Sequence, residues 1–143
     1  MGLILALPAP VPADAFGGRR AVLYAEATVM LAENAPWVSG RSDCSCQMWR
    51  LLSKVFPELR TQKWFRRTTA AVMADWPWEP LMSLDEVYFG DLLFTGRPKL
   101  NHVMMTWTDP DQLIHASKRR GFTVDELHPY WAPRIEAAIR PPY

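Results

Sequence analysis

Residues 42–55 read SDCSCQMWRLLSKV, and this stretch contains a helix start, an amphipathic pattern and two thiols. Ser42 or Asp43 can cap a helix, because short oxygen-bearing side chains accept hydrogen bonds from the free N–H groups of the first turn. Pro57 follows and ends the helix. One face collects apolar side chains at spacings of three and four: Cys44, Met48, Leu51, Leu52 and Val55. We therefore predict an amphipathic helix with Cys44 in its first turn.

Cys44 occupies a position at which a thiol can be activated. The positive end of a helix lowers the pKa of a thiol by favouring the thiolate, which is the nucleophilic form. A nearby histidine would lower that pKa further by forming an ion pair. The alternative is that Cys44 packs in the core as a small apolar side chain.

Helical patterns surround this stretch, and β-type patterns follow it. We expect an extended arm over residues 1–18, a helix over 19–34, and a short helix from Thr68 or Thr69 through residue 75. Short β-type runs separated by Gly, Pro and Asp occupy residues 87–94, 102–107, 112–115 and 122–124. Residues 131–140 are expected to add one or two helical turns. This order predicts an α+β fold in which residues 19–143 form one domain, with the helices packed on an antiparallel sheet.

His102 opens one apolar run and His115 closes the next, with turn residues Thr-Asp-Pro-Asp at 108–111 between them. A two-residue hairpin loop at 108–109 would place the two histidines directly opposite each other. A four-residue loop shifts the pairing by two residues and keeps both histidines on the same face. In either case His102 can act as a base for a thiol and His115 can orient it. The alternative is that each is a half-buried structural histidine.

Composition and charge argue against several classes of protein. The net charge is +1, whereas nucleic-acid binding usually requires a strongly basic surface. No stretch approaches the roughly 18 apolar residues of a membrane span. Cys44 and Cys46 are too close for a structural disulfide, and they lack the second ligand pair of a zinc site. We expect no metal, no cofactor, no nucleic-acid partner and no clear signal peptide.

Five short motifs follow one another along the chain: Asp43-Cys44-Ser45, Arg67-Thr68-Thr69, Gly90-Asp91-Leu92-Leu93-Phe94, His102-Val103 and Ile114-His115-Ala116. In order and approximate spacing they resemble the motifs of NlpC/P60 cysteine peptidases. The family's versions are Asp-Cys-Ser-Gly, Arg-Thr-Ser/Thr, Gly-Asp-Leu-Val-Phe, His-Val-Gly-Ile and Ile-His-Ala. The resemblance extends over residues 20–140, which is nearly the whole chain.

The resemblance implies a papain-like core whose nucleophile helix packs on a small antiparallel sheet. It implies a triad of Cys44, His102 and His115, and a peptidoglycan stem peptide as substrate. Such enzymes form a thioester with the substrate's acyl group and then hydrolyse it. The backbone N–H of Cys44 is a candidate for stabilising the oxyanion. The side chains that are candidates for substrate or oxyanion contacts are Asp43, Ser45 and Trp37.

Three departures from the family pattern put the substrate in doubt more than the chemistry. Cys46 replaces the usual glycine, Trp37 stands where the family commonly has a tyrosine, and residues 104–105 are both methionine instead of small. Two other functions therefore stay open. One is a non-catalytic structural domain, for instance of a phage tail, and the other is a papain-like acyltransferase. A phage virion, a lysis system or another large assembly that delivers the chain to the cell wall is an expected setting.

Overall fold

The computed structural model describes residues 17–143. Helices come first: α1 (Gly18–Glu33), α2 (Cys44–Val55), a 3-10 helix (Pro57–Thr61) and α3 (Ala70–Met73). The strands are β1 (Glu79–Pro80), β2 (Leu92–Thr95), β3 (His102–Thr106), β4 (Gln112–Ser117), β5 (Gly121–Glu126) and β6 (Ile135–Arg140). The arm expected over residues 1–18 lies outside the described residues except at its end, where Gly18 already belongs to α1.

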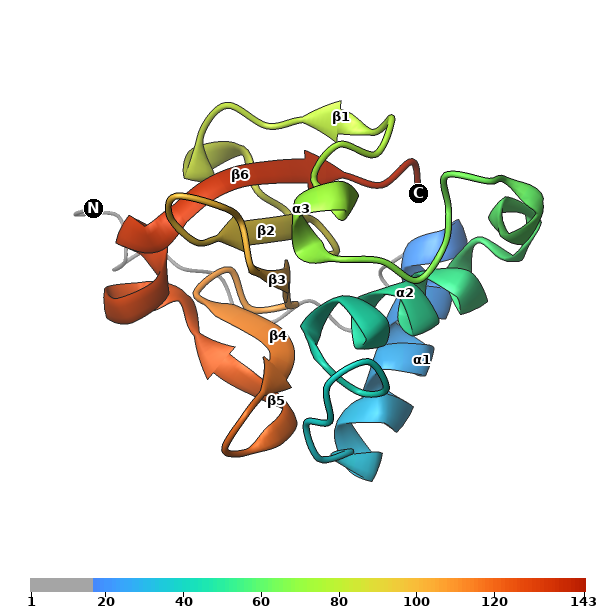
Figure 1. Cartoon of the computed structure of the whole chain (residues 1–143), viewed down its shortest axis with the longest axis horizontal. Helices are drawn as coiled ribbons and strands as arrows, with labels where there is room; N and C mark the ends of the chain where they lie inside the picture. Colours follow the sequence, from blue (N-terminus) through green and yellow to red (C-terminus); the bar gives the residue numbers. More distant parts are fainter. Residues whose placement is uncertain (1–16) are drawn as a thin grey trace.

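The strands form one antiparallel sheet in the order β1-β6-β2-β3-β4-β5. Figure 1 shows α1 and α2 on one side of this sheet, near β3, β4 and β5. Both helices contact the sheet, α2 at β3 and β4 and α1 at β5. The predicted α+β fold, with N-terminal helices packed on an antiparallel sheet, is confirmed. Within residues 17–143, no helix is long and apolar enough to cross a membrane.

The apolar faces of the two long helices supply about a third of the buried residues of the main core. On α1 the buried side chains lie at spacings of four and three: Leu23, Ala27 and Met30. On α2 the buried apolar residues include Met48, Leu51, Leu52 and Val55. Each fully buried side chain of this size contributes roughly 1.5–3 kcal/mol to folding. This burial fixes α2, and with it the residue at its N-terminus, against the sheet.

The hairpin between β3 and β4 uses the longer of the two loops considered above. Met105 pairs with Ile114 and Thr106 pairs with Leu113, so residues 108–111 form a four-residue loop. In that loop the backbone N–H of Asp111 donates to Asp109 Oδ1 at 2.9 Å, which stabilises the turn. The two-residue loop is therefore wrong, and the histidines share a face without lying directly opposite each other.

Two segments differ from the elements expected for them. The run 87–94 forms a strand only from Leu92, because residues 84–86 form a 3-10 helix capped by Ser83 and a turn follows. In the tail, helical turns cover Leu127–Trp131 and Ala132–Arg134, but residues 135–140 form strand β6 rather than helix. β6 lies between β1 and β2, and pairing on both edges outweighs the helix propensity of its alanines.

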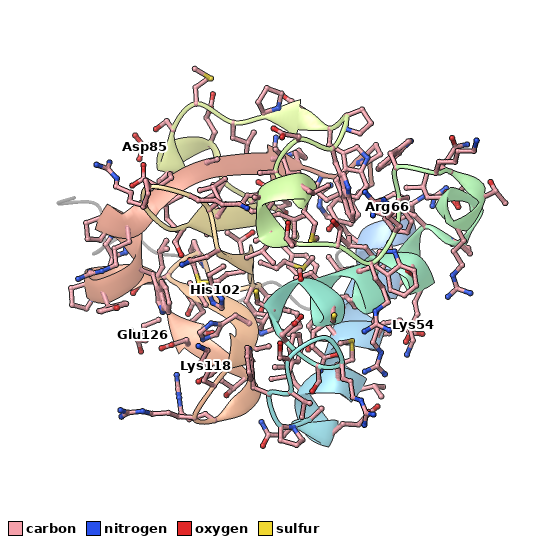
Figure 2. The ribbon with its side chains drawn as sticks, in the orientation of Figure 1. Lys54, Arg66, Asp85, His102, Lys118 and Glu126 are labelled. Carbon is pink, nitrogen blue, oxygen red and sulfur yellow. The ribbon has the colours of Figure 1, made fainter. Side chains whose placement is uncertain are left out.

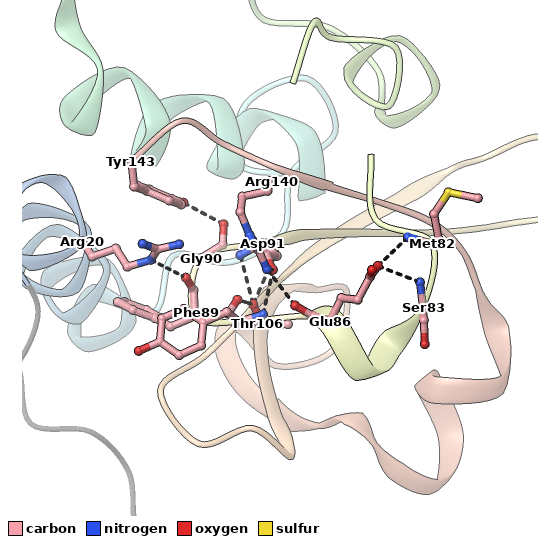
Figure 3. A network of polar contacts seen from close by, with 11 residues as sticks. Arg20, Met82, Ser83, Glu86, Phe89, Gly90, Asp91, Thr106, Arg140 and Tyr143 are labelled. Atoms are coloured by element: carbon pink, nitrogen blue, oxygen red, sulfur yellow. Dashed lines mark hydrogen bonds and ion pairs between the residues drawn. The ribbon is translucent and has the colours of Figure 1, made fainter. Parts of the chain in front are cut away.

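A buried ion pair fastens β6 to the start of β2 (Figure 3). Asp91 has no exposed surface and receives two bonds from Arg140, Nε to Oδ1 at 3.0 Å and Nη2 to Oδ2 at 2.8 Å. The hydroxyl of Tyr143 donates to the Gly90 carbonyl at 2.7 Å. Gly90 has φ of 95°, and a Cβ there would lie 2.7 Å from the Tyr143 oxygen. The Gly-Asp motif therefore has a structural role, since it allows this close contact and holds the C-terminal strand.

Candidate active site

The N-terminus of α2 presents Cys44 from a tightly capped loop. Asp43 is the cap: its Oδ1 accepts from the N–H of Cys46 at 3.1 Å, and its Oδ2 accepts from the N–H of Gly40 at 2.7 Å. Gly40 adopts a φ of 74°, which favours glycine. Cys44 follows the cap directly and stays half-buried. Its thiol lies 3.8 Å from the backbone carbonyl of Asn101, the residue before β3.

The two histidines meet at the start of β3 and in the middle of β4. His102 Nε2 lies 2.9 Å from His115 Nδ1. The other nitrogen of His115, Nε2, lies 3.2 Å from Asp125 Oδ2 on β5. His115 is 3% exposed, whereas His102 is half-buried and lines a cavity. The result is a chain of three side chains that runs from a buried carboxylate contact to a cavity.

The Asp125 carboxylate determines which ring nitrogens of His115 and His102 carry protons. An ionised carboxylate only accepts hydrogen bonds, so His115 Nε2 is the donor to Asp125. A neutral His115 then accepts at Nδ1, and His102 donates its Nε2 proton to it. This leaves Nδ1 of His102 unprotonated and able to accept a proton.

Trp131, which follows β5 in the sequence, contacts all three residues: His102, His115 and Asp125. Its ring stacks on His102 with centroids 5.3 Å apart and planes at 23°, and it meets His115 edge-on at 5.4 Å. The indole N–H donates to Asp125 Oδ2 at 3.3 Å. Arg120 adds an ion pair to the same oxygen at 2.8 Å. Asp125 therefore has three different side-chain donors around one oxygen, which fix its position.

A cavity of about 390 Å³ brings Cys44, His102 and His115 together. Its lining residues are Trp37, Cys44, Asn101, His102, His115, Ala116, Ser117, Lys118 and Trp131. A second cavity of about 480 Å³ shares Trp37, Cys44 and Asn101 with it and extends past Asp43 and Ser45. Cys44 thus borders two adjoining cavities, as an extended substrate would require. All six predicted site residues lie on the walls of this pair of cavities.

Burial is the largest influence on the pKa values of Cys44 and His102. It raises the pKa of the Cys44 thiol, and the nearby Asp43 charge adds to this effect, while a backbone hydrogen bond at Val103 opposes it. Burial, together with the charges of His115 and Lys118, lowers the pKa of His102 to about 4. The Cys44 pKa is therefore raised and not lowered as expected, with loss of solvation as the largest cause. The resting pair is a neutral thiol and a neutral imidazole.

Burial also acts on the pKa values of His115 and Asp125, but it prevails only at His115. Burial lowers the pKa of His115 although the Asp125 carboxylate acts to raise it. For Asp125, burial acts to raise the pKa. It is outweighed by the Glu126 N–H, the Trp131 N–H and the Arg120 charge, so the pKa falls below its ordinary value. Asp125 is thus an ionised acceptor at neutral pH, as the proton assignment above requires.

Cys46 is a packing residue of this helix rather than part of the cavities. It is 5% exposed, and Arg67 Nη2 donates to its sulfur at 3.4 Å. Arg67 also donates to the carbonyl of Gly40. The Arg-Thr-Thr motif therefore connects the segment before α3 to the loop that presents Cys44. Within residues 17–143, no group of three His, Cys, Asp or Glu side chains is arranged to hold a metal ion.

The site residues that were not expected from the sequence include Asp125, Trp131, Lys118 and Asn101. Strand alternation could have indicated Asp125. In the hairpin of β4 and β5, Leu113 pairs with Asp125, which puts Asp125 on the same sheet face as His115. A longer β5 assignment would have found it. Trp131 belongs to a helical turn after β5, and no local pattern connects it to His102.

Comparisons with known proteins identify the fold. No protein-family model and no curated protein matches the sequence. Among solved structures, the NlpC/p60 domain of the peptidoglycan hydrolase SagA is similar, with 23% identity and a TM-score of 0.60 over 85% of this chain and 97% of that one. An NlpC/P60 family protein from Bacillus cereus has 16% identity and a TM-score of 0.66, over 92% of this chain and 41% of that one.

The peptidoglycan hydrolase RipB from Mycobacterium tuberculosis is also similar, with 17% identity and a TM-score of 0.60. That match covers 95% of this chain and 74% of RipB. The chain therefore has the NlpC/P60 fold that its five motifs predicted.

Proposed function

We propose that this chain is a cysteine peptidase that hydrolyses amide bonds in the stem peptides of peptidoglycan. The observation that carries the proposal is the shared cavity of Cys44 and His102, with His102 oriented by His115 and Asp125. Two of the similar structures, SagA and RipB, are peptidoglycan hydrolases by name, which supports the choice of substrate.

The first half of the reaction forms a thioester. Nδ1 of His102 takes the proton of the Cys44 thiol, and the sulfur attacks the carbonyl carbon of the scissile amide. When the tetrahedral intermediate collapses, the C–N bond breaks and the imidazolium of His102 gives its proton to the leaving amine. In the second half, His102 takes a proton from water, the hydroxide attacks the thioester, and the carboxylate product leaves as the thiol re-forms.

His115 and Asp125 act through His102 and are positioning residues. The hydrogen bonds engage Nε2 of His102 and so fix its ring and leave Nδ1 to take the proton, and the Asp125 charge stabilises the imidazolium that forms after proton transfer. Stabilisation of the imidazolium is needed because the Cys44 thiol and the His102 imidazole are both neutral at rest, so the proton moves during the attack.

The contacts of Asp43, Ser45 and Trp37 indicate which of these three candidates can touch the substrate. The Asp43 carboxylate accepts two backbone N–H groups, so its role is to fix the helix N-terminus. Ser45 is buried, with its hydroxyl 3.5 Å from Asp43 Oδ1. Trp37 forms a wall of both cavities and is the candidate for substrate contact. The Cys44 N–H, at the first turn of α2, is the candidate oxyanion donor.

Digestion of purified peptidoglycan sacculi tests the proposal, with released fragments identified by mass spectrometry. The wild-type chain is expected to cleave stem peptides and Cys44→Ala is expected to release none. Cys46→Ala is the matched control, because it removes a thiol two residues away that lies outside the cavities, and it should retain cleavage. If folded, reduced wild-type protein cleaves no wall chemotype, the structural domain or the acyltransferase becomes the better reading.

A further inference from the structure

Lys118 places a positive charge in the cavity of Cys44. It lies in the turn between β4 and β5, and its ammonium stands over the ring of Trp37, 5.0 Å from the centroid. Both side chains line the 390 Å³ cavity together with Cys44 and His102. Figure 2 shows Lys118 and His102 on the same side of the molecule, next to the N-terminal end of α2.

Among the residues that the structure describes, no carboxylate is paired with this charge. None of the residues that line the cavity is Asp or Glu, and within residues 17–143 Lys118 forms no ion pair. The nearest acidic groups have other partners: Asp43 accepts from backbone N–H groups, and Asp125 accepts from Arg120, Trp131 and His115. Two basic neighbours differ in this respect, since Arg120 is paired with Asp125 and Arg97 with Glu136, whereas the exposed Arg119 is also without an ion pair in the described part of the chain but lines neither cavity at Cys44.

We propose that Lys118 and Trp37 form a subsite for a carboxylate of the substrate, so that peptides with a free carboxylate beside the scissile amide are preferred over their carboxamides. The inference rests on the proposed peptidase function and names the substrate chemistry that this site selects. Lys118 is an exposed residue, and its ammonium over the Trp37 ring can attract an anion that enters the cavity.

The position of Lys118 also connects binding to chemistry. Its charge contributes to the low pKa of His102, because a cation nearby disfavours the imidazolium. A substrate carboxylate at Lys118 offsets that repulsion when His102 takes the thiol proton. An anionic substrate is therefore expected to gain in kcat as well as in KM, whereas a neutral amide leaves the repulsion in place.

A matched pair of γ-D-glutamyl stem peptides tests the subsite, one with a free α-carboxylate on the glutamyl residue and one with a carboxamide there. The wild-type chain should cleave the carboxylate peptide with a kcat/KM a few-fold higher, the size expected for one ion pair with an exposed lysine. In Lys118→Met the two peptides should be cleaved at similar rates. Lys118→Arg should restore most of the preference, because it restores the charge.

Arg119→Met is the matched control. It removes the same charge from the adjacent position, where the exposed side chain lines neither of the two cavities at Cys44, and the wild-type preference should persist. A second readout needs no substrate: the His102 ring, titrated by NMR, should have a higher pKa in Lys118→Met than in the wild type and an unchanged one in Arg119→Met.

The possible failures are distinguishable. Equal cleavage of both peptides by the wild type, or an unchanged preference in Lys118→Met, overturns the subsite and leaves the peptidase intact. If neither peptide is cleaved, the proposed function fails for this substrate. Binding of the two peptides to Cys44→Ala then decides the subsite, which is overturned if the carboxylate peptide binds no more tightly than the carboxamide.

Discussion

Two carboxylates, the fully buried Asp91 and the partly exposed Asp125, anchor polar networks in different parts of the sheet, and the networks end differently. Asp91 is paired with the permanent cation of Arg140 and closes a set of contacts that fastens β6 to β2. Asp125 contacts His115, which contacts His102, and that chain ends on an open nitrogen at a cavity. A network whose members are all satisfied stabilises the fold, whereas one with an unused acceptor can perform chemistry.

The largest expected effect breaks the first network. Asp91→Asn leaves Arg140 without its charge partner in a mostly buried place, and loss of one member of a buried pair costs about 3–5 kcal/mol. Chemical denaturation of wild type and variant measures the difference. Activity per folded molecule should stay near the wild-type value. A stability change below about 1 kcal/mol would show that solvent replaces Asp91, and that the network is less closed than its geometry indicates.

A smaller effect should come from the second network, and on activity instead of stability. Asp125→Asn keeps the shape but removes the charge that stabilises the imidazolium, and its amide can donate to His115 and favour the wrong tautomer. We expect kcat/KM to fall about ten- to a hundredfold, as for other residues that orient a functional group indirectly. The unfolding free energy is measured in parallel. If it falls as much as in Asp91→Asn while kcat holds, the division of roles is wrong.

The smallest effect is a displacement of the pH profile. His102 must be neutral to take the thiol proton, and its pKa is about 4, so kcat/KM should be flat above pH 5 and fall only as the pH drops through about 4. An unperturbed histidine would place this acid limb near pH 6.5. A limb near 6.5 would contradict the burial argument.

The same pKa has a consequence for stability, and its sign follows from proton binding. Between pH 6.5 and 4 the unfolded chain binds a proton at His102 that the folded chain does not, so stability decreases as the pH falls through that window. In His102→Gln this decrease should be smaller. Thermal unfolding of the two proteins at pH 7 and pH 4.5 makes the comparison.

The sequence by itself determined the helix at Cys44, its Asp43 cap, the α+β order of elements and the common face of His102 and His115. These features depend on residues close together in the chain: side-chain periodicity, capping chemistry and turn composition. The five motifs added the fold itself, which the solved structures confirm.

Only the tertiary structure decided the hairpin register, the strand at residues 135–140, and the meeting of Asp125, Trp131 and Lys118 around the histidines. It also reversed the expected direction of the Cys44 pKa. Strand pairing, burial and the local electric field are properties of segments that are distant in sequence and adjacent in space. Because desolvation grows with the number of such neighbours, no pattern within a single segment could have given its size or sign.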